Sequence, residues 1–418
     1  MRAQRVTDES TSPVLRGVDE LRNVALAHKA SGRRIIACCG LLLPVALLWL
    51  ISRSLSWRPQ QWEVGGHVIA LAFSPAEPIL ACSVLRERAG GNVTSELQLW
   101  NIQPKRRVWS RTLGEGGDTL AFSPDGKSLA SAYFDVEVWD VPSGKRLRAL
   151  HGRHAIGALQ STALLFAPNS QTLFFSESDA VLQVFDVNAG RVTRTVSIAA
   201  EAYALSSPQP ISEDAAFRQG YRTYASVYVS PDGKTLASDV SIWAAGGVPL
   251  GAFSVAPVGA EVWLRDAKGR VIHELKKAGG IIAFSPDSKL LFTCPNTKNA
   301  LNIQVWNVRT GKLTRTLSLP APKLGASRVI ESGSPSQDGE LFAAIITDER
   351  HPAELHIQVW NMDTGQWMRT VKPPHPPNVS GGLIAWSYDS STLVYANDTY
   401  ASVEERTRPS PVQTWRIR

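Results

Sequence analysis

Cysteine, methionine and histidine are scarce in this chain, whose 418 residues include four cysteines, three methionines and eight histidines. So few cysteines do not make a disulfide-stapled scaffold, and none of them has the spacing of a zinc site. Cys38 and Cys39 lie in a long apolar run, whereas Cys82 and Cys294 lie in separate predicted strands. We expect buried thiols and no bound metal.

Charged residues are also few, at 19% of the chain, and the formal net charge of +7 is unevenly placed. Residues 1–34 hold seven Lys or Arg and four acids, which gives +3, and Arg53 with Arg58 adds +2. The remaining 360 residues therefore carry only +2 (7 − 3 − 2). A near-neutral region of this length does not have the basic stripe of a nucleic-acid binder.

Groups that carry catalysis are not gathered in the sequence. His151 and His154 form a His-x-x-His pair, but no third ligand follows at zinc spacing. His351, His356 and His375 have no Ser or Cys partner recognisable as a triad, and no glycine-rich loop leads from a strand into a helix. The sequence thus predicts no catalytic, cofactor-binding or metal-binding residue.

Short strands and tight turns are abundant instead, most clearly between Leu120 and Leu150. Leu120–Phe122 is followed by the turn Ser-Pro-Asp-Gly, in which proline presets one φ angle and glycine accepts a positive one. The segments 128–133, 136–139 and 145–150 then read as three further strands. A sheet of about 30 residues cannot bury its faces alone, so it is expected to pack on copies of itself.

Six copies are recognisable by their first turn and by an aromatic residue in the third strand. The other turns are Phe73-Ser74-Pro75, Phe166-Ala167-Pro168, Ser230-Pro231-Asp232-Gly233, Ser285-Pro286-Asp287, Ser336-Gln337-Asp338-Gly339 and Ser387-Tyr388-Asp389. The third-strand aromatics are Trp100, Trp139, Phe185, Trp263, Trp306, Trp360 and Trp415. Six of the 13 tryptophans thus share one predicted position, which indicates seven repeats.

With these turns and its Trp-Asp and Trp-Asn dipeptides, the chain resembles a bacterial WD-repeat protein from about Trp57 to Arg418. The resemblance implies an all-β fold, a seven-bladed β-propeller of four-stranded antiparallel blades. The Gly-His pair of the family is present in the first repeat as Gly66-His67, and Trp-Asp is intact only at Trp139-Asp140. The hydrogen-bond network that the family builds from His, Ser, Asp and Trp is therefore incomplete in most blades.

A single transmembrane helix is predicted before the repeats, at residues 35–52. Ile35–Ile51 is a run of 17 residues without a charge, which meets the lower limit for a span. An uncleaved signal anchor is the first interpretation; a cleaved signal peptide and a buried soluble helix are the alternatives. More Lys and Arg precede the run than follow it, which favours a cytoplasmic N-terminus and an extracytoplasmic propeller, periplasmic or on the cell surface.

The predicted domains are a basic, disordered cytoplasmic tail (1–34), the membrane helix (35–52), a linker (53–59) and the propeller (60–418). Repeat seven ends in its third strand, and Gln60–Val64 has the pattern of a fourth strand. We therefore expect strand 60–64 to pair with 412–417 and close the ring, because closure removes an exposed edge.

Long connections are expected on one face of the ring, at 85–96, 198–223, 240–260, 347–353 and 397–411. Recognition usually sits on such loops, although drift of unconstrained loops is an alternative. The candidate partner-binding residues are Arg86, Arg88, Tyr203, Phe217, Tyr221, Trp243, Phe253, Arg350, Tyr400 and Arg406.

The function expected from these observations is a membrane-anchored, non-catalytic scaffold that binds protein partners, with no cofactor and as a monomer. The alternative is an exported propeller hydrolase or lactonase with its site on the loops. The innermost strands argue against it, because their expected residues are mostly small or branched and apolar, without histidine. Only Asp118 and Glu331 flank them, and loops could still supply acids.

Overall fold

The computed structural model describes residues 59–87, 93–113, 119–132, 135–151, 164–178, 181–197, 221–244, 261–295, 302–318, 328–348, 351–373, 382–397 and 411–418. The predicted tail, the predicted membrane helix and nearly all of the linker lie outside the described residues. Within the described ranges no helix has the length and apolarity needed to span a bilayer.

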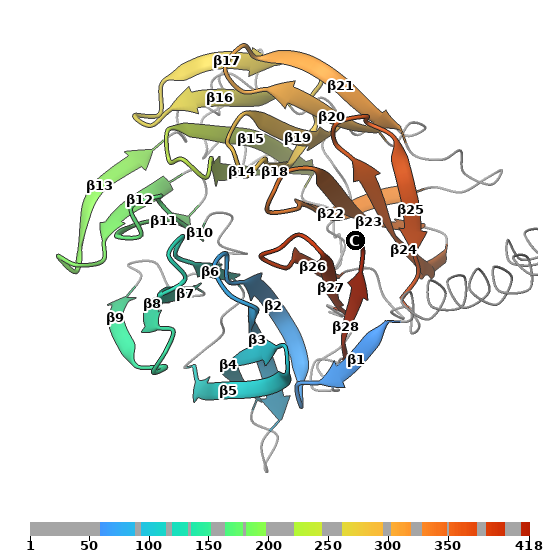
Figure 1. The fold of residues 1–418 in the computed structure, drawn as a ribbon. Helices are drawn as coiled ribbons and strands as arrows, with labels where there is room; N and C mark the ends of the chain where they lie inside the picture. The colour runs from blue at the N-terminus through green and yellow to red at the C-terminus, as the bar shows by residue number, and fades with distance from the viewer. Residues whose placement is uncertain are drawn as a thin grey trace, which may run out of the picture. The chain divides into compact units, whose positions relative to one another are not determined.

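Seven four-stranded antiparallel sheets make up the described part of the chain, which confirms the all-β architecture (Figure 1). Blades 1 to 3 are β2 (His67–Phe73), β3 (Ile79–Glu87), β4 (Val93–Ile102) and β5 (Lys105–Thr112); β6 (Thr119–Phe122), β7 (Ser128–Ala132), β8 (Asp135–Asp140) and β9 (Arg146–His151); and β10 (Leu164–Phe166), β11 (Thr172–Ser178), β12 (Val181–Asp186) and β13 (Arg191–Ser197). Blades 4 and 5 are β14 (Tyr221–Val229), β15 (Thr235–Ala244), β16 (Val262–Asp266) and β17 (Val271–Leu275); and β18 (Gly280–Phe284), β19 (Leu290–Cys294), β20 (Asn302–Asn307) and β21 (Lys312–Ser318). Blades 6 and 7 are β22 (Arg328–Pro335), β23 (Leu341–Asp348), β24 (His351–Asn361) and β25 (Trp367–Val371); and β26 (Leu383–Trp386), β27 (Thr392–Ala396), β28 (Pro411–Arg416) and β1 (Gln60–Glu63).

Blade 7 joins the two ends of the propeller. β1 pairs antiparallel with β28, with Gln60 opposite Thr414 and Glu63 opposite Pro411. The outer strand of this blade therefore comes from the start of the propeller and the other three from its end. The innermost strands β2 and β26 lie next to each other, so the ring closes between blades 7 and 1 (Figure 1).

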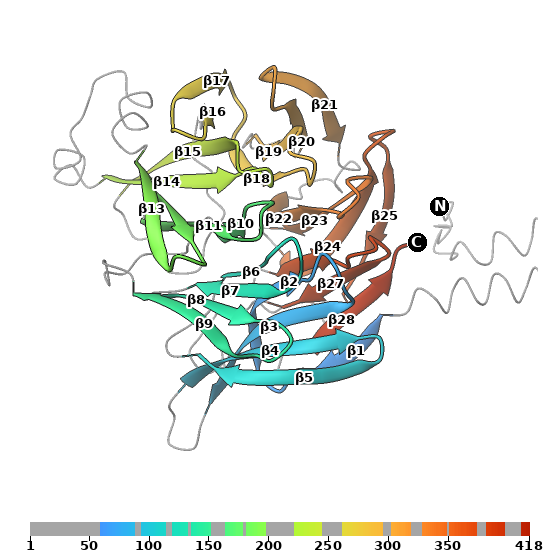
Figure 2. The ribbon, with the colours of Figure 1, turned by 60° about the vertical axis from the view of Figure 1, so that its left-hand side comes forward.

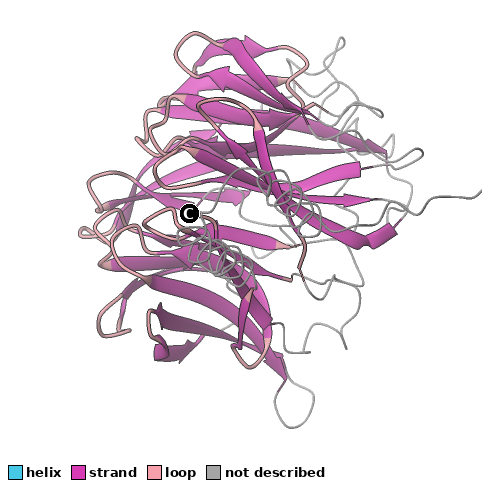
Figure 3. Ribbon diagram, turned by 45° about the vertical axis from the view of Figure 1, so that its right-hand side comes forward, coloured by secondary structure: helices cyan, strands magenta, loops and turns pink. Residues whose placement is uncertain are grey.

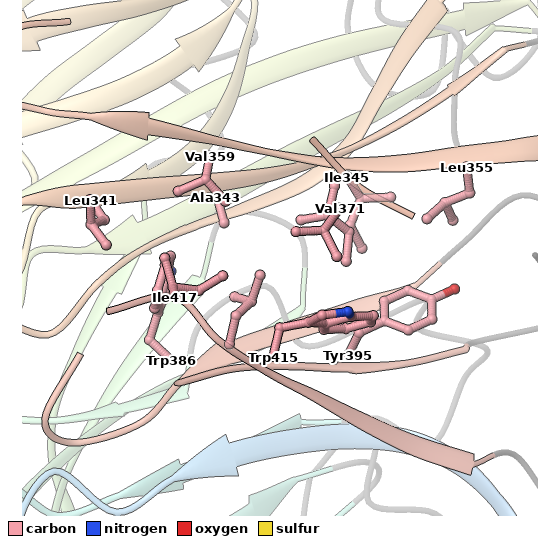
Figure 4. Close-up of a cluster of buried hydrophobic side chains, with 12 residues drawn as sticks. Leu341, Ala343, Ile345, Leu355, Val359, Val371, Trp386, Tyr395, Trp415 and Ile417 are labelled. Carbon is pink, nitrogen blue, oxygen red and sulfur yellow. The ribbon is translucent and has the colours of Figure 1, made fainter. Parts of the chain in front are cut away.

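The hydrophobic core lies between neighbouring blades. Alternating residues of each strand point to opposite faces of its sheet, and both faces are covered by a neighbouring sheet. Between blades 6 and 7, Trp386, Tyr395 and Trp415 pack against apolar residues of β23 and β24 (Figure 4). Each blade is thus stable only as part of the ring, as the repeat argument requires.

One of the seven aromatic residues expected at the same third-strand position lies elsewhere. In blade 2, Trp139 lies opposite Leu129, and the same register places Trp100, Phe185, Trp306, Trp360 and Trp415 at the equivalent position of five other blades. In blade 4 the residue opposite Leu236 is Arg265, and Trp263 lies two residues earlier. The prediction of Trp263 at this position is wrong, because a tryptophan two residues away keeps the same face and satisfies the same pattern.

In the second strand, the residue that faces this third-strand position carries a hydroxyl only in blades whose third-strand residue offers a donor N–H. The indole of Trp139 donates to Ser131 (3.1 Å), that of Trp306 donates to Thr293 (3.0 Å), and the guanidinium of Arg265 donates through Nε to Ser238 (3.1 Å). The equivalent residues of the other blades carry no aliphatic hydroxyl; they are Cys82, Phe175, Ala344 and Tyr395. Three of these blades still carry an N–H donor, on Trp100, Trp360 and Trp415, so the hydroxyl occurs only with a donor, but the donor also occurs without the hydroxyl. In blade 1, Cys82 fills the position as a small buried thiol whose pKa is raised by burial.

Candidate interaction surface

In a four-stranded blade, the first-to-second and third-to-fourth turns lie on one face of the ring, here called the turn face. The second-to-third loops and the connections between blades lie on the other, here called the insertion face. Figure 3 shows the short turns, in pink, gathered along one side of the ring. The described residues of the two faces differ in the contacts that they make.

Serine–aspartate pairs fasten the turn face. In blade 2, Ser123 Oγ donates to Asp125 Oδ1 (2.6 Å) and accepts the backbone N–H of Ser128 (2.9 Å). The same two contacts, at 2.5–2.6 Å and 2.9 Å, recur in four more blades, at Ser230 with Asp232, Ser285 with Asp287, Ser336 with Asp338 and Ser387 with Asp389. These serines are buried, so each hydroxyl is committed to its turn.

A second set of serines links the turns of neighbouring blades in pairs. Ser170, Ser288 and Ser390 adopt φ angles of 56–62°, where blades 2, 4 and 6 use glycine. The hydroxyl of each accepts the turn N–H of the preceding blade, from Asp125 (3.2 Å), Asp232 (2.9 Å) and Asp338 (3.0 Å). Blades 2 and 3, 4 and 5, and 6 and 7 are therefore coupled through their turns.

The repeated arginine of the outer strands also links blades. In blade 2, Arg148 donates to Val187 O (3.0 Å) in the next blade. In blade 1 the equivalent residue is Trp109, which donates to Val141 O (2.7 Å), while Arg111, two residues later, donates to the carbonyls of Gly144 (2.8 Å) and Ser143 (3.0 Å). Arg315 repeats the contact with Met362 and Asp363, and His273 replaces the arginine in blade 4, against Arg309 O (2.9 Å). These residues have a structural role, since they satisfy carbonyls of the third-to-fourth turns.

Extended strands, in contrast, project on the insertion face from blades 1, 4 and 6. The β3–β4 ladder continues to Glu87 opposite Val93, and the β14–β15 ladder to Tyr221 opposite Ala244. In blade 6, β24 is 11 residues long, whereas the equivalent strand of blade 2 has six. Parts of the segments expected as loops are thus strand, because their residues continue the pairing of the ladder.

Arg86, one of the candidate contacts, is half-buried and already engaged by groups of its own chain. Its Nη2 donates to Val64 O (3.1 Å) and its Nε lies 2.8 Å from Glu96 Oε2. The same guanidinium packs against Gly65, which has a φ of +78° and whose Cβ, if present, would stand 2.8 Å from Nη2. Arg86 therefore fixes the passage from β1 to β2, and a partner could contact it only in part.

Two further candidates are brought close by the backbone. Tyr221 begins β14, and Trp243 lies near the end of the neighbouring β15, opposite Arg222. Both thus lie at the insertion-face end of blade 4. The other candidates lie outside the described residues: Arg88, Tyr203, Phe217, Phe253, Arg350, Tyr400 and Arg406.

The inner strands differ from the expectation at two points. β2 begins at His67, which is buried, so an inner strand does contain a histidine. In blade 6 Glu331 occupies the bulge that Ile69 and Ile282 occupy in blades 1 and 5, and its carboxylate accepts a hydrogen bond from Thr347 (2.6 Å). Among the described residues no three His, Cys, Asp or Glu side chains come together as a metal site would require.

Acidic groups meet at two places in blade 4. Burial raises the pKa of Glu261, and a hydrogen bond with Glu274 raises it further. Burial also raises the pKa of the Tyr228 phenol, with the charge of Asp239 adding to the effect. Neither place includes a nucleophile next to a base, the arrangement that covalent catalysis needs.

Comparison with known proteins supports the fold. No protein-family profile matches the chain, and no curated protein matches its sequence. Among solved structures, the chain is similar to the Cps50 (Swd1) β-propeller domain of Myceliophteria thermophila, with a TM-score of 0.58 and 15% identity over 86% of this chain and 100% of that one. It is also similar to a chain of the mitotic checkpoint complex, with a TM-score of 0.56 and 16% identity over 86% of this chain and 91% of that one. At such identities the similarity supports the fold alone, the seven-bladed β-propeller described above.

Proposed function

We propose that the chain is a non-catalytic interaction scaffold that binds protein partners through the insertion face. The observation that carries this proposal is the asymmetry between the faces. Buried hydroxyls, aspartates and arginines fasten the turn face, whereas blades 1, 4 and 6 extend their strands on the other. A rigid ring that varies on one face is the usual arrangement for recognition. The solved structures that the chain resembles include a multiprotein checkpoint assembly.

The anchor belongs to the proposal as well. The uncharged run Ile35–Ile51 would hold the propeller at a membrane, with the N-terminus in the cytoplasm and the propeller outside it. Resistance of the full chain to alkaline carbonate extraction, together with protease access to the propeller from outside sealed cells, is the expected result. Release into the soluble fraction would remove the anchor from the proposal and leave the scaffold.

Site-specific photocrosslinking in the native membrane tests the choice of face. A photoreactive phenylalanine analogue at Val93, 42% exposed on the insertion face, is expected to trap discrete proteins. The matched control is the same analogue at Tyr388, 38% exposed in a first-to-second turn. Trapping of the same proteins at both positions, or only at Tyr388, would contradict the proposal. Turnover by the purified full chain in a hydrolase panel would instead favour an enzyme.

A further inference from the structure

Although the net charge of the propeller is close to neutral, part of its outer edge carries only positive charges. The third-to-fourth turns and outer strands of blades 1 and 2, residues 103–112 and 141–151, contain seven Lys or Arg and no acid. All seven are exposed: Lys105, Arg106, Arg107, Arg111, Lys145, Arg146 and Arg148. We call this surface the basic edge. β5 and β9 form the outer edges of neighbouring sheets (Figure 2).

Among the described residues, most of these charges have no acidic partner. Of the seven, only Arg146 forms an ion pair with a described residue, at 2.5 Å from Glu137. Arg111 and Arg148 donate to carbonyls, and Lys105 lies 4.7 Å from the centre of the Trp62 ring. Carbonyls and indole rings orient a cation but carry no net charge, so the positive potential of the edge remains.

Exposed apolar side chains stand among these charges. Val108 follows Arg107 and is 41% exposed, and Leu147 follows Arg146 and is 39% exposed. The outer strands of blades 1 and 2 contribute one such residue each, so the apolar area of the basic edge is divided. Divided apolar contacts flanked by Lys and Arg suit a fluid surface of phosphate headgroups better than one protein, which needs a contiguous patch.

The position of the basic edge agrees with this occupant. Lys105 of blade 1 contacts Trp62 on β1, so the edge lies next to the strand that begins at Gln60. Eight residues, 52–59, separate that strand from the uncharged run, and at ~3.3–3.6 Å per residue they reach about 26–29 Å at most. If the run spans the bilayer, blade 1 is among the parts of the ring kept nearest to it.

We propose that the basic edge binds anionic phospholipid headgroups and holds the ring edge-on at the membrane, leaving the insertion face open at the side. This inference rests on the anchor of the proposed function. It adds a second membrane contact, which would turn a free tether into a fixed orientation, since one membrane attachment raises the effective concentration of the other.

Lipid photocrosslinking with the full chain in vesicles tests the proposal. The analogue is placed at Val108 or, as a matched control, at Leu313, which is 45% exposed and follows Lys312 on the outer strand of blade 5. In phosphatidylcholine vesicles containing phosphatidylglycerol, we expect the lipid crosslink to be at least about fivefold stronger at Val108, the factor set by roughly one charge near an anionic surface. The excess is expected to vanish in pure phosphatidylcholine and to fall at high salt.

Charge removal provides the second arm. The variant Arg106→Gln/Arg107→Gln is expected to abolish the excess at Val108, while Arg309→Gln/Lys312→Gln on blade 5 leaves it unchanged. Circular dichroism of both variants verifies the fold. Equal crosslinking at the two positions, or an excess that is independent of anionic lipid, overturns the proposal. Crosslinks to protein or to added nucleic acid at Val108 in place of lipid overturn it too.

The anchor itself is scored separately, by carbonate extraction of the same vesicles. A chain that resists extraction but shows no excess at Val108 refutes the basic edge and keeps the anchor. A chain that is extracted refutes the anchor, and with it the tethered geometry proposed here.

Discussion

Blades 2 and 4 meet the same packing problem with different chemistry. At one position of the third strand, blade 2 buries the indole of Trp139 and blade 4 buries the guanidinium of Arg265, which has no exposed surface. Both donate to a serine at the same place in the second strand, Ser131 or Ser238. Arg265 also donates to Gly269 O (2.9 Å), inside its own third-to-fourth turn. In these two blades a large flat donor fills the position, and it need not be an aromatic ring.

Truncating the two side chains gives the largest expected effect. Arg265→Ala and Trp139→Ala are each expected to lower the free energy of unfolding by about 3–5 kcal/mol, because a large buried side chain leaves a cavity. Denaturant unfolding of the full chain measures it. The exposed Arg270→Ala in the same blade, which loses only an ion pair with Asp266, is the control at about 0–1 kcal/mol. A loss below about 1 kcal/mol for Arg265→Ala would show that the two residues are not equivalent.

Removing the two serine acceptors is expected to destabilise the protein more in blade 4 than in blade 2. Ser238→Ala is expected to cost about 1.5–3 kcal/mol, because its partner is charged, and Ser131→Ala about 0.5–1.5 kcal/mol. The same unfolding curves give both values. Equal losses would mean that the charge of Arg265 is balanced elsewhere and that Ser238 contributes only an ordinary hydrogen bond.

The indole N–H of blade 2 can be tested alone. Trp139→Phe is expected to cost about 0.5–1.5 kcal/mol through the hydrogen bond with Ser131, and Trp306→Phe the same through Thr293. Blade 3 provides a natural reference, since Phe185 and Phe175 occupy these two positions without a hydroxyl. The double variant Trp139→Phe/Ser131→Ala should therefore lose less than the two single losses added together.

The smallest effect is expected from acid titration of a turn. Burial tends to raise the pKa of Asp125, but hydrogen bonds from Ser123 and the Lys127 N–H, the charge of Lys127 and a contact with Ser170 lower it overall. A carboxyl with a lowered pKa in the folded state adds stability above its unfolded pKa of about 3.9, and this stability is lost as the pH falls through the folded value. Asp125→Asn should therefore reduce stability at pH 7 and weaken its loss below about pH 4, as acid unfolding followed by tryptophan fluorescence would show.

The fold could be predicted from the sequence because its turns contain residues with strong conformational preferences, such as proline with its fixed φ and glycine at positive φ. Ser-x-Asp turns, and third-to-fourth turns that contain glycine, recur at fixed distances from alternating strands, and the last repeat lacks a fourth strand that Gln60–Glu63 supplies. The identity of the position opposite Leu236 could not be predicted by the same means. Trp263 and Arg265 lie on the same face of β16, and apolar character alone selects the wrong one. The Ser238 hydroxyl, matched to Ser131 and Thr293, was the signal that could have identified Arg265.

The candidate contacts were less predictable than the fold. The sequence places Arg86 in an expected loop and so predicts a partner contact. In the structure its guanidinium binds Val64 O and Glu96, 22 and 10 residues away. Such roles depend on contacts that strand periodicity does not contain. The basic edge was missed for a different reason, since a net charge summed over the propeller cancels charges that the fold places far apart.

The ring cannot close by pairing of β1 with β28 until the last strand has been synthesised. The two strands meet through residues 354 positions apart, at Gln60 and Thr414. At about 5–20 residues per second, a ribosome needs roughly 20–70 s to make what separates them. Over that interval β1 exists as a nascent segment whose partner has not yet been made. The sequence of β1 limits aggregation of this unpaired strand, because Gln60, Gln61 and Glu63 are polar.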